Sequence, residues 1–218
     1  MKERKITRIE KPSPRTRRYN IYVDGEILLS VHEDVLVKYR LRKGMQIDEK
    51  EVQALLEAEE YNKAKQAAYR YLSYKPRTTQ ELKMVLTRKG YDSERTDRVI
   101  NELKASGFLN DLEYAKAWVD ERQRYKGYGK KRLRQELLKK GIASSIVDEV
   151  LTDMDEEEQR RLAISIAERR YSRIKSEPWT KIERRLGNYL VRQGYSMSIV
   201  YDVLYLFRTR HEEEKETE

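Results

Sequence analysis

The feature that most limits what this chain can fold into is an internal repeat about 50 residues long. Two leucines four residues apart are followed, four residues later, by a glycine, and this pattern occurs three times in one register. The three copies are Leu82, Leu86 and Gly90, then Leu133, Leu137 and Gly141, then Leu186, Leu190 and Gly194. A repeat of this period is typical of stacked supersecondary units that each contact only their neighbours.

Each copy of the repeat is predicted to be three helices. The first is an alanine-rich segment, the second ends at the repeat glycine, and a short third helix carries a pair of β-branched or leucine residues. The expected first helices are Ala64–Leu72, Ala115–Arg124 and Leu162–Tyr171. The leucines are expected to be buried on one face, and each glycine to turn left-handed where its helix ends.

The starts of the second helices carry capping signals in two of the three repeats. Thr78-x-x-Glu81 and Thr180-x-x-Glu183 match the capping box, in which two side chains satisfy the first backbone N–H groups of a helix. In repeat two Gly129 occupies this position, which predicts a weaker cap. Glu156, Glu157 and Glu158 are expected to open the first helix of repeat three, where negative charge favours the helix dipole.

The N-terminal segment differs from the repeats. The first 18 residues carry eight basic and two acidic side chains and are interpreted as a basic arm. Residues 18–23 and 26–31 then flank Asp24-Gly25, which predicts a hairpin with a type I′ turn. A helix is expected from about Glu33 to Leu41, ended by Gly44, and Asp48 is expected to cap a long helix after it. The hairpin element is expected to cover the open end of the helical array, and a second binding surface is the alternative.

Composition excludes several classes of protein. The chain has no cysteine and only two histidines, His32 and His211, so no disulfide framework, thiolate metal site or histidine-rich metal site is expected. There is no P-loop, no Gly-x-Ser-x-Gly and no His-Glu-x-x-His motif, and we expect neither an enzyme nor a bound cofactor. No apolar run approaches the roughly 20 residues that cross a bilayer, so a soluble cytoplasmic protein without membrane contact is expected.

Positive charge gathers in one place. The net charge is +9, but residues 122–141 alone hold nine basic side chains and a single acid, Glu136. Surface helices usually intersperse both signs, so a stretch almost free of acid indicates a phosphate-rich or strongly acidic partner. A solvated helix face is the alternative interpretation.

These patterns predict a mainly α fold: an elongated array of three tandem three-helix, helix-turn-helix-like repeats, with a small N-terminal β-hairpin and helix element. The predicted divisions are 1–60 for the basic arm, hairpin and helix, 61–111, 112–155 and 156–210 for repeats one to three, and 211–218 for an acidic tail.

Three runs of residues resemble a known family. They are the segment 71–82, with sequence Tyr-Leu-Ser-Tyr-Lys-Pro-Arg-Thr-Thr-Gln-Glu-Leu, then Gly107-Phe108-Leu109-Asn110-Asp111 with Tyr114-Ala115, and Lys126-Gly127-Tyr128-Gly129 with the segment 136–142. Together they are similar to the RecX regulatory proteins. Thr78 stands where that family usually has Ser, and Tyr114 where Phe is usual, and both changes keep the physical role.

The resemblance implies a non-enzymatic regulator that binds the filament of the RecA recombinase on single-stranded DNA. A monomer is expected separately. The resemblance also implies inhibition of RecA ATP hydrolysis and strand exchange, in DNA repair, recombination and the SOS response. Basic and aromatic side chains of repeats one and two are then expected to face DNA phosphates or acidic RecA surface, without reading base sequence. The expected binding residues are Arg77, Lys83, Arg88, Lys89, Arg122, Arg124, Tyr125, Lys126, Tyr128, Lys130, Lys131, Arg132, Arg134, Lys139 and Lys140.

A helix-turn-helix transcription regulator is the competing hypothesis. Short helices joined by glycine turns, and a basic helix over Lys130–Lys140, are compatible with it. Three similar units in one chain suit a repeat array better than a dimeric operator reader.

Overall fold

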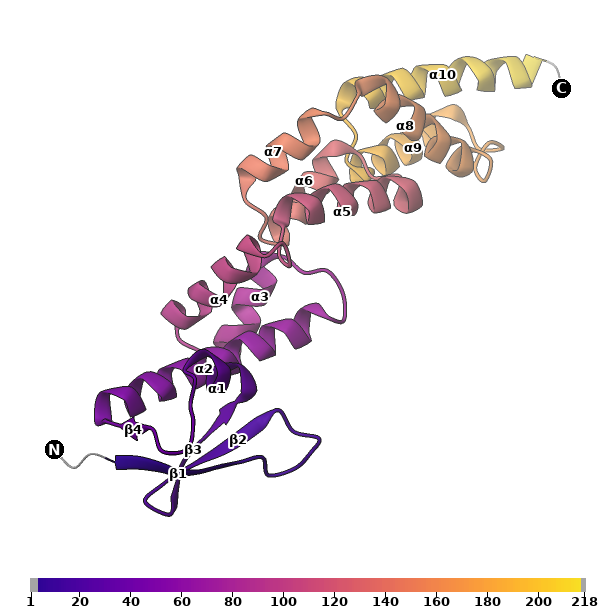
Figure 1. Cartoon of the computed structure of the whole chain (residues 1–218). Coiled ribbons are helices and arrows are strands. Elements are labelled where there is room, and N and C mark those ends of the chain that lie inside the picture. The colour runs from indigo at the N-terminus through magenta and orange to yellow at the C-terminus, as the bar shows by residue number, and fades with distance from the viewer. Residues whose placement is uncertain (1–3, 217–218) are drawn as a thin grey trace. The chain divides into compact units, whose positions relative to one another are not determined.

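The computed structural model describes residues 4–216 and consists of a small antiparallel sheet followed by helices (Figure 1). The chain divides into two compact units. The first unit lies within Met1–Pro76 and Leu82–Phe108, and the second within Arg77–Glu81 and Leu109–Glu218. Within residues 4–216, none of the helices combines the length and apolar content required to cross a bilayer.

The sheet of the first unit has four strands in the order β3-β2-β1-β4, all antiparallel. The strands are β1 (Arg4–Glu10), β2 (Arg18–Val23), β3 (Glu26–His32) and β4 (Gln46–Ile47). The predicted hairpin is confirmed, because Asp24 and Gly25 both have positive φ, at 52° and 92°, as a type I′ turn requires. The side chains of Ile6, Ile21 and Val31, one from each of β1, β2 and β3, are fully buried in the core of this unit.

Two details of the N-terminal prediction differ from the structure. Residues 4–10, interpreted as part of a basic arm, form the strand β1, because Ile6 points into the core while its charged neighbours face water. Helix α1 (Glu33–Lys38) ends before Leu41, and Arg40 takes the left-handed conformation. Gly44 instead begins the turn to β4, where its N–H donates to the carbonyl oxygen of Ile6.

The predicted capping residue of the long helix is confirmed. Asp48 and Glu51 form a complete capping box at the start of α2 (Glu49–Leu72). The C-terminal part of this one continuous helix is the expected first helix of repeat one, so α2 passes through residues 60 and 61 without a break. Repeat one continues with α3 (Thr79–Arg88) and α4 (Ser93–Ala105).

Repeats two and three have the predicted three helices each. They are α5 (Asp111–Lys126), α6 (Lys130–Lys139) and α7 (Ser144–Thr152), then α8 (Glu156–Tyr171), α9 (Trp179–Gln193) and α10 (Met197–Glu216). All six repeat leucines are fully buried, and Gly90, Gly141 and Gly194 all have φ between 78° and 93°. The repeat glycines therefore end their helices as predicted.

The capping predictions have mixed outcomes. Thr78 and Glu81 form the expected reciprocal hydrogen bonds, and Gly129 is a cap without a side-chain bond. The box predicted at Thr180 is wrong: Pro178 occupies the cap position of α9, whose first residue is Trp179, so Thr180 is already inside the first turn.

The C-terminal residues continue α10 rather than leaving it. His211, which begins the segment predicted as an acidic tail, is only 3% exposed and hydrogen-bonds through Nδ1 to the hydroxyl of Tyr171, 3.0 Å away. Helix α10 runs on to Glu216. The first turn of α8 carries Glu156, Glu157 and Glu158 as predicted.

Candidate partner-binding surface

The basic stretch of the sequence becomes the end of α5, a three-residue turn and the whole of α6, all within the second unit. Gly127 ends α5 in the left-handed conformation, at φ 61°, and Gly129 precedes α6. This turn brings the basic residues at the end of one helix close to those at the start of the next.

Gly129 fixes α6 against the end of α9. A Cβ atom at Gly129 would lie 2.6 Å from both the carbonyl carbon and the oxygen of Gly194, so only glycine permits this approach. The Gly129 N–H donates to the Gln193 carbonyl at 2.8 Å, and the Lys131 N–H to the Gly194 carbonyl at 3.0 Å. The start of α6 is thereby held by backbone contacts.

The backbone donors at the start of α6 already have acceptors within the protein. Besides the two bonds to the end of α9, the Lys130 N–H donates to Oε1 of Gln159 at 3.2 Å. Free N–H groups at the start of a helix often hold phosphate, but here they are occupied. An anionic partner would therefore be bound by side chains.

Arg132 is held in place by the protein. Its guanidinium lies over the ring of Tyr128, 3.8 Å from the centroid, and donates to the Tyr128 hydroxyl at 2.9 Å. It also donates to the carbonyl oxygen of Arg192 and to Oε1 of Gln193, both at 3.2 Å. Two predicted binding residues, Arg132 and Tyr128, thus tie α6 to the end of α9.

Arg122, on α5, is held in a similar way. Its guanidinium lies 3.9 Å from the ring centroid of Trp118 and 3.4 Å from Oε2 of Glu136. Glu136 also accepts a hydrogen bond from Nε1 of Trp118 at 3.1 Å. The single acid of the basic stretch is therefore the anchor of a packed cluster.

Lys140 joins the end of α6 to the start of α3. Its Nζ donates to Oε1 of Glu81 at 2.7 Å and lies 4.9 Å from the ring centroid of Trp118. The hydroxyl of the fully buried Thr78 donates to the Lys140 carbonyl at 2.9 Å. Burial opposes ionisation of Glu81, but hydrogen bonds from Lys140 and from the Thr78 N–H outweigh it, so the pKa of Glu81 lies below its usual value.

Two further arginines are engaged at the surface. Arg134 pairs with Asp148 on α7, and the hydrogen bond from Arg134 lowers the pKa of that carboxyl. Arg124 lies 3.4 Å from Asp120, one turn earlier on α5. Both pairs are exposed, so each contributes little to stability.

Four lysines of the stretch remain exposed, and their side chains have no ion pair or hydrogen bond with any residue that the structure describes. We call them the free-lysine surface: Lys126, Lys130, Lys131 and Lys139. Lys131 and Lys139 are eight residues apart on the solvent face of α6, about 12 Å along its axis. Lys126 ends α5 within about 15 Å of Lys130, given the chain that joins them. Tyr125, beside Lys126, is 71% exposed.

Two of these lysines occupy positions that do not stabilise the helix. Lys130 and Lys131 lie in the first turn of α6, which carries no acidic residue. Positive charge near the start of a helix opposes the helix dipole. Stability of the helix therefore does not explain the two unpaired cations in this turn.

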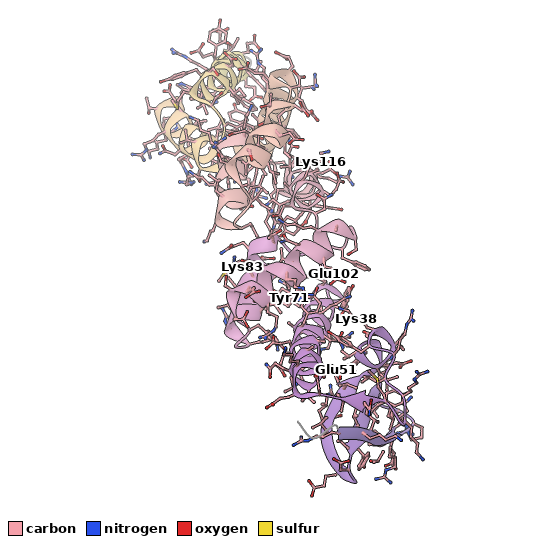
Figure 2. All side chains as sticks on the ribbon, turned by 60° about the vertical axis from the view of Figure 1, so that its left-hand side comes forward. Lys38, Glu51, Tyr71, Lys83, Glu102 and Lys116 are labelled. Carbon is pink, nitrogen blue, oxygen red and sulfur yellow. The ribbon has the colours of Figure 1, made fainter. Side chains whose placement is uncertain are left out.

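The predicted binding residues of repeat one are more dispersed. Lys83 pairs with Asp97 on α4 at 2.6 Å; it is labelled in Figure 2. Arg88 and Lys89 are exposed at the end of α3, in the first unit. Arg77 is half-buried in the second unit, where its charge helps to lower the pKa of Glu81. Three of these residues thus belong to the first unit and Arg77 to the second.

One exposed surface was missed by reasoning from the sequence. Met197, Tyr201 and Tyr205 occur every four residues on α10 and are 45%, 64% and 76% exposed. Their spacing at i, i+4 and i+8 is the signal that could have found them, since it places all three on one helix face. Exposed tyrosines are frequent anchors in protein interfaces.

Residues 4–216 contain no group of three His, Asp or Glu side chains placed to hold a metal ion. The arrangement of α5 and α6 instead provides exposed positive charge on a fixed frame, which suits binding to an anionic surface.

Comparisons with known proteins give a consistent result. Four family models match in order along the chain: the N-terminal domain of regulatory protein RecX over residues 4–48, and the first, second and third three-helix domains of RecX over 64–103, 110–151 and 156–204.

Whole-length relatives carry the same name. The regulatory protein RecX of Clostridium beijerinckii is 30% identical over 202 residues, covering 92% of this chain and 94% of the relative. That of Clostridioides difficile is 32% identical over 199 residues, covering 91% and 93%. A crystal structure of regulatory protein RecX is similar with a TM-score of 0.80 and 32% identity, covering 92% of this chain and 98% of that one.

Proposed function

This chain belongs to the RecX family of non-enzymatic regulatory proteins, and from that premise we propose that it binds the filament of RecA on single-stranded DNA and inhibits RecA ATP hydrolysis and strand exchange. Its role would then be to modulate recombination and DNA repair, including the SOS response. We also propose that it acts as a monomer in the cytoplasm.

The observation that carries the proposal is the free-lysine surface. Its four cations have no partner among the described residues, while the cations next to them are held by Glu136, Glu81 and other groups of the frame. A filament of protein on DNA offers phosphates and acidic side chains at high density. Lysine, a compact charge on a flexible stem, suits such contacts without reading base sequence.

Electrostatic contacts of this kind have a recognisable signature. Each cation that neutralises a phosphate releases a counterion, so affinity falls as salt rises. We expect binding to the filament to be sensitive to salt and tolerant of DNA sequence, and binding to free DNA to be weaker, because the filament adds protein contacts to the phosphate contacts.

The alternative function, a helix-turn-helix transcription regulator, would use α6 as its recognition helix. Such a helix reads bases with residues near its N-terminus. Here that end is packed against the end of α9 through Gly129, and Arg132 is held by Tyr128 and Gln193. The free side chains of this turn are Lys130 and Lys131, which suit contacts to phosphates better than reading of bases, and this favours binding to a filament over an operator.

Co-sedimentation with RecA filaments tests the proposal. Filaments formed on poly(dT) with a slowly hydrolysed ATP analogue should carry the full chain into the pellet, and RecA ATPase measured in parallel with ATP should fall as the chain is added. RecA without DNA and poly(dT) without RecA are the controls. Absence of the chain from the filament pellet, or binding without loss of ATPase, would contradict the proposal. Preference for one duplex by about 1,000-fold over random DNA would favour the transcription regulator.

A further inference from the structure

The first unit contains a pocket that the proposed function does not use. It has a volume of about 420 Å³ and lies along one face of α2, with Arg18 and His32 of the sheet at one side and Tyr91, between α3 and α4, among its walls. Small-molecule sites usually have volumes of about 300–1,000 Å³. The pocket is therefore large enough for an organic ligand rather than a single ion.

The only carboxylate among the lining residues is already neutralised. Glu59 is 3% exposed, and its Oε1 lies 2.7 Å from Nη1 of Arg18. Its Oε2 accepts the His32 backbone N–H at 2.7 Å. Since Arg18 and Glu59 cancel, the pocket does not repel an anion.

Other lining groups are hydrogen-bond donors without an acceptor. Asn62 is 5% exposed, and its buried Nδ2 has no hydrogen-bond partner. Leaving a buried amide unpaired costs free energy, so an acceptor from a ligand or from water would stabilise it. The guanidinium of Arg70, two turns further along α2, and the hydroxyl of Tyr91 also lack a partner among the described residues.

The surrounding charges leave Arg70 as the unbalanced one. Lys63, at the same pocket, pairs with Glu60 at 2.6 Å. Gln66 is within 3.5 Å of Asp34 through Nε2, which is a weak contact. The pocket lining therefore includes one uncompensated positive charge, an unpaired amide donor and a tyrosine ring, around a space much larger than an oxyanion alone requires.

We propose that this pocket binds a phosphate ester of a nucleoside, with Arg70 and Nδ2 of Asn62 donating to the phosphate oxygens. Arginine presents several donors in a geometry that matches phosphate. The ring of Tyr91 provides a surface on which a base can stack. The same chemistry could come from a free nucleotide or from the backbone of single-stranded DNA. The proposal concerns the protein alone and does not depend on RecA.

Calorimetric titration of the full chain tests the site with four probes: dAMP, deoxyadenosine, inorganic phosphate and a short oligo(dT). Binding of dAMP, at least tenfold tighter than that of deoxyadenosine or inorganic phosphate, would assign a free nucleotide. Binding of oligo(dT) but not of dAMP would assign a backbone phosphate. The proposal would be overturned if neither dAMP nor oligo(dT) bound at millimolar concentration. It would also be overturned if dAMP bound no more tightly than deoxyadenosine or inorganic phosphate.

Substitutions then locate the binding in the pocket. R70A and N62L should each weaken it at least tenfold, whereas R42A, which removes an exposed arginine of the same unit, should leave it unchanged. Because Arg70 is exposed, R70A should fold normally and carries the test even if N62L does not fold. Binding that R70A leaves intact would contradict the assignment.

Discussion

Lys131 and Arg132 are neighbours in the chain and carry the same charge, yet they lie in different environments. Arg132 packs on Tyr128 and donates to groups at the end of α9, whereas Lys131 extends into solvent with no side-chain partner among the described residues. The same division runs through the whole basic stretch: five of its nine cations are paired within the protein and four are free. The number of basic residues in a stretch of sequence therefore overestimates the size of a binding surface, because some of those residues form contacts within the fold.

The largest expected effect comes from the contact that fixes α6. Gly129→Ala should destabilise the second unit by about 3 kcal/mol, because the added methyl group meets backbone atoms that cannot rotate away. Urea unfolding followed by circular dichroism measures this. Gly187→Ala is the control: its methyl group would lie 3.4 Å from Leu204, and alanine favours a helix by about 1 kcal/mol over glycine. Equal stability of the two variants would show that α6 is not fixed by this approach.

The next largest effect on stability distinguishes Arg132 from its neighbour Lys131. Arg132→Ala should lower the free energy of unfolding by about 2 kcal/mol, since it removes hydrogen bonds from a charged group and a cation–π contact. Lys131→Ala should change it by less than about 0.5 kcal/mol. The same urea experiment checks both. If the two substitutions had similar effects on stability, the division into held and free cations would fail.

A smaller, pH-dependent effect on stability is expected at the ion pair between Lys140 and Glu81. The pKa of Glu81 is lowered in the folded protein, so its contribution to stability is present above the ordinary value of 4.5 and is lost as pH falls through the lower folded value. Glu81→Gln should therefore cost about 1 kcal/mol at pH 7 and progressively less below pH 4.5. Urea midpoints at pH 7 and pH 3 for both proteins measure this. If the substitution lowered stability equally at pH 7 and at pH 3, the charge of Glu81 would have no role in stability.

Local patterns in the sequence predict much of this frame. The repeat leucines and glycines, the hairpin turn at Asp24 and the capping box at Thr78 are each determined by residues a few positions apart. The strand β1 was missed because a single buried residue, Ile6, stands among charged ones. The box at Thr180 was predicted wrongly because the cap of α9 is Pro178, two residues before the position that the motif requires.

The division of the cations could not be predicted in the same way. Arg132 meets Arg192 and Gln193, and Lys140 meets Glu81, across about 60 residues of sequence in each case. Such partners depend on how the repeats pack, which the charge pattern does not encode. The 15 predicted binding residues remain a prediction, and the structure supports four lysines among them as the ones to test first.

The most direct test of the central claim compares two variants with the same net charge. One reverses the free-lysine surface to glutamate at Lys126, Lys130, Lys131 and Lys139. The matched control reverses four exposed lysines elsewhere, Lys50, Lys104, Lys181 and Lys215. The measurement is the affinity for RecA filaments on poly(dT), with inhibition of RecA ATPase, across a range of salt concentrations.

We predict that reversal of the free-lysine surface weakens filament binding by about tenfold or more and reduces the dependence of log affinity on log salt by about 4. The control variant should bind and inhibit within about threefold of the unaltered chain, because local contacts outweigh net charge at physiological salt. Both variants should be equally helical. Equal losses in the two variants, or unchanged binding after reversal of the free-lysine surface, would contradict the account.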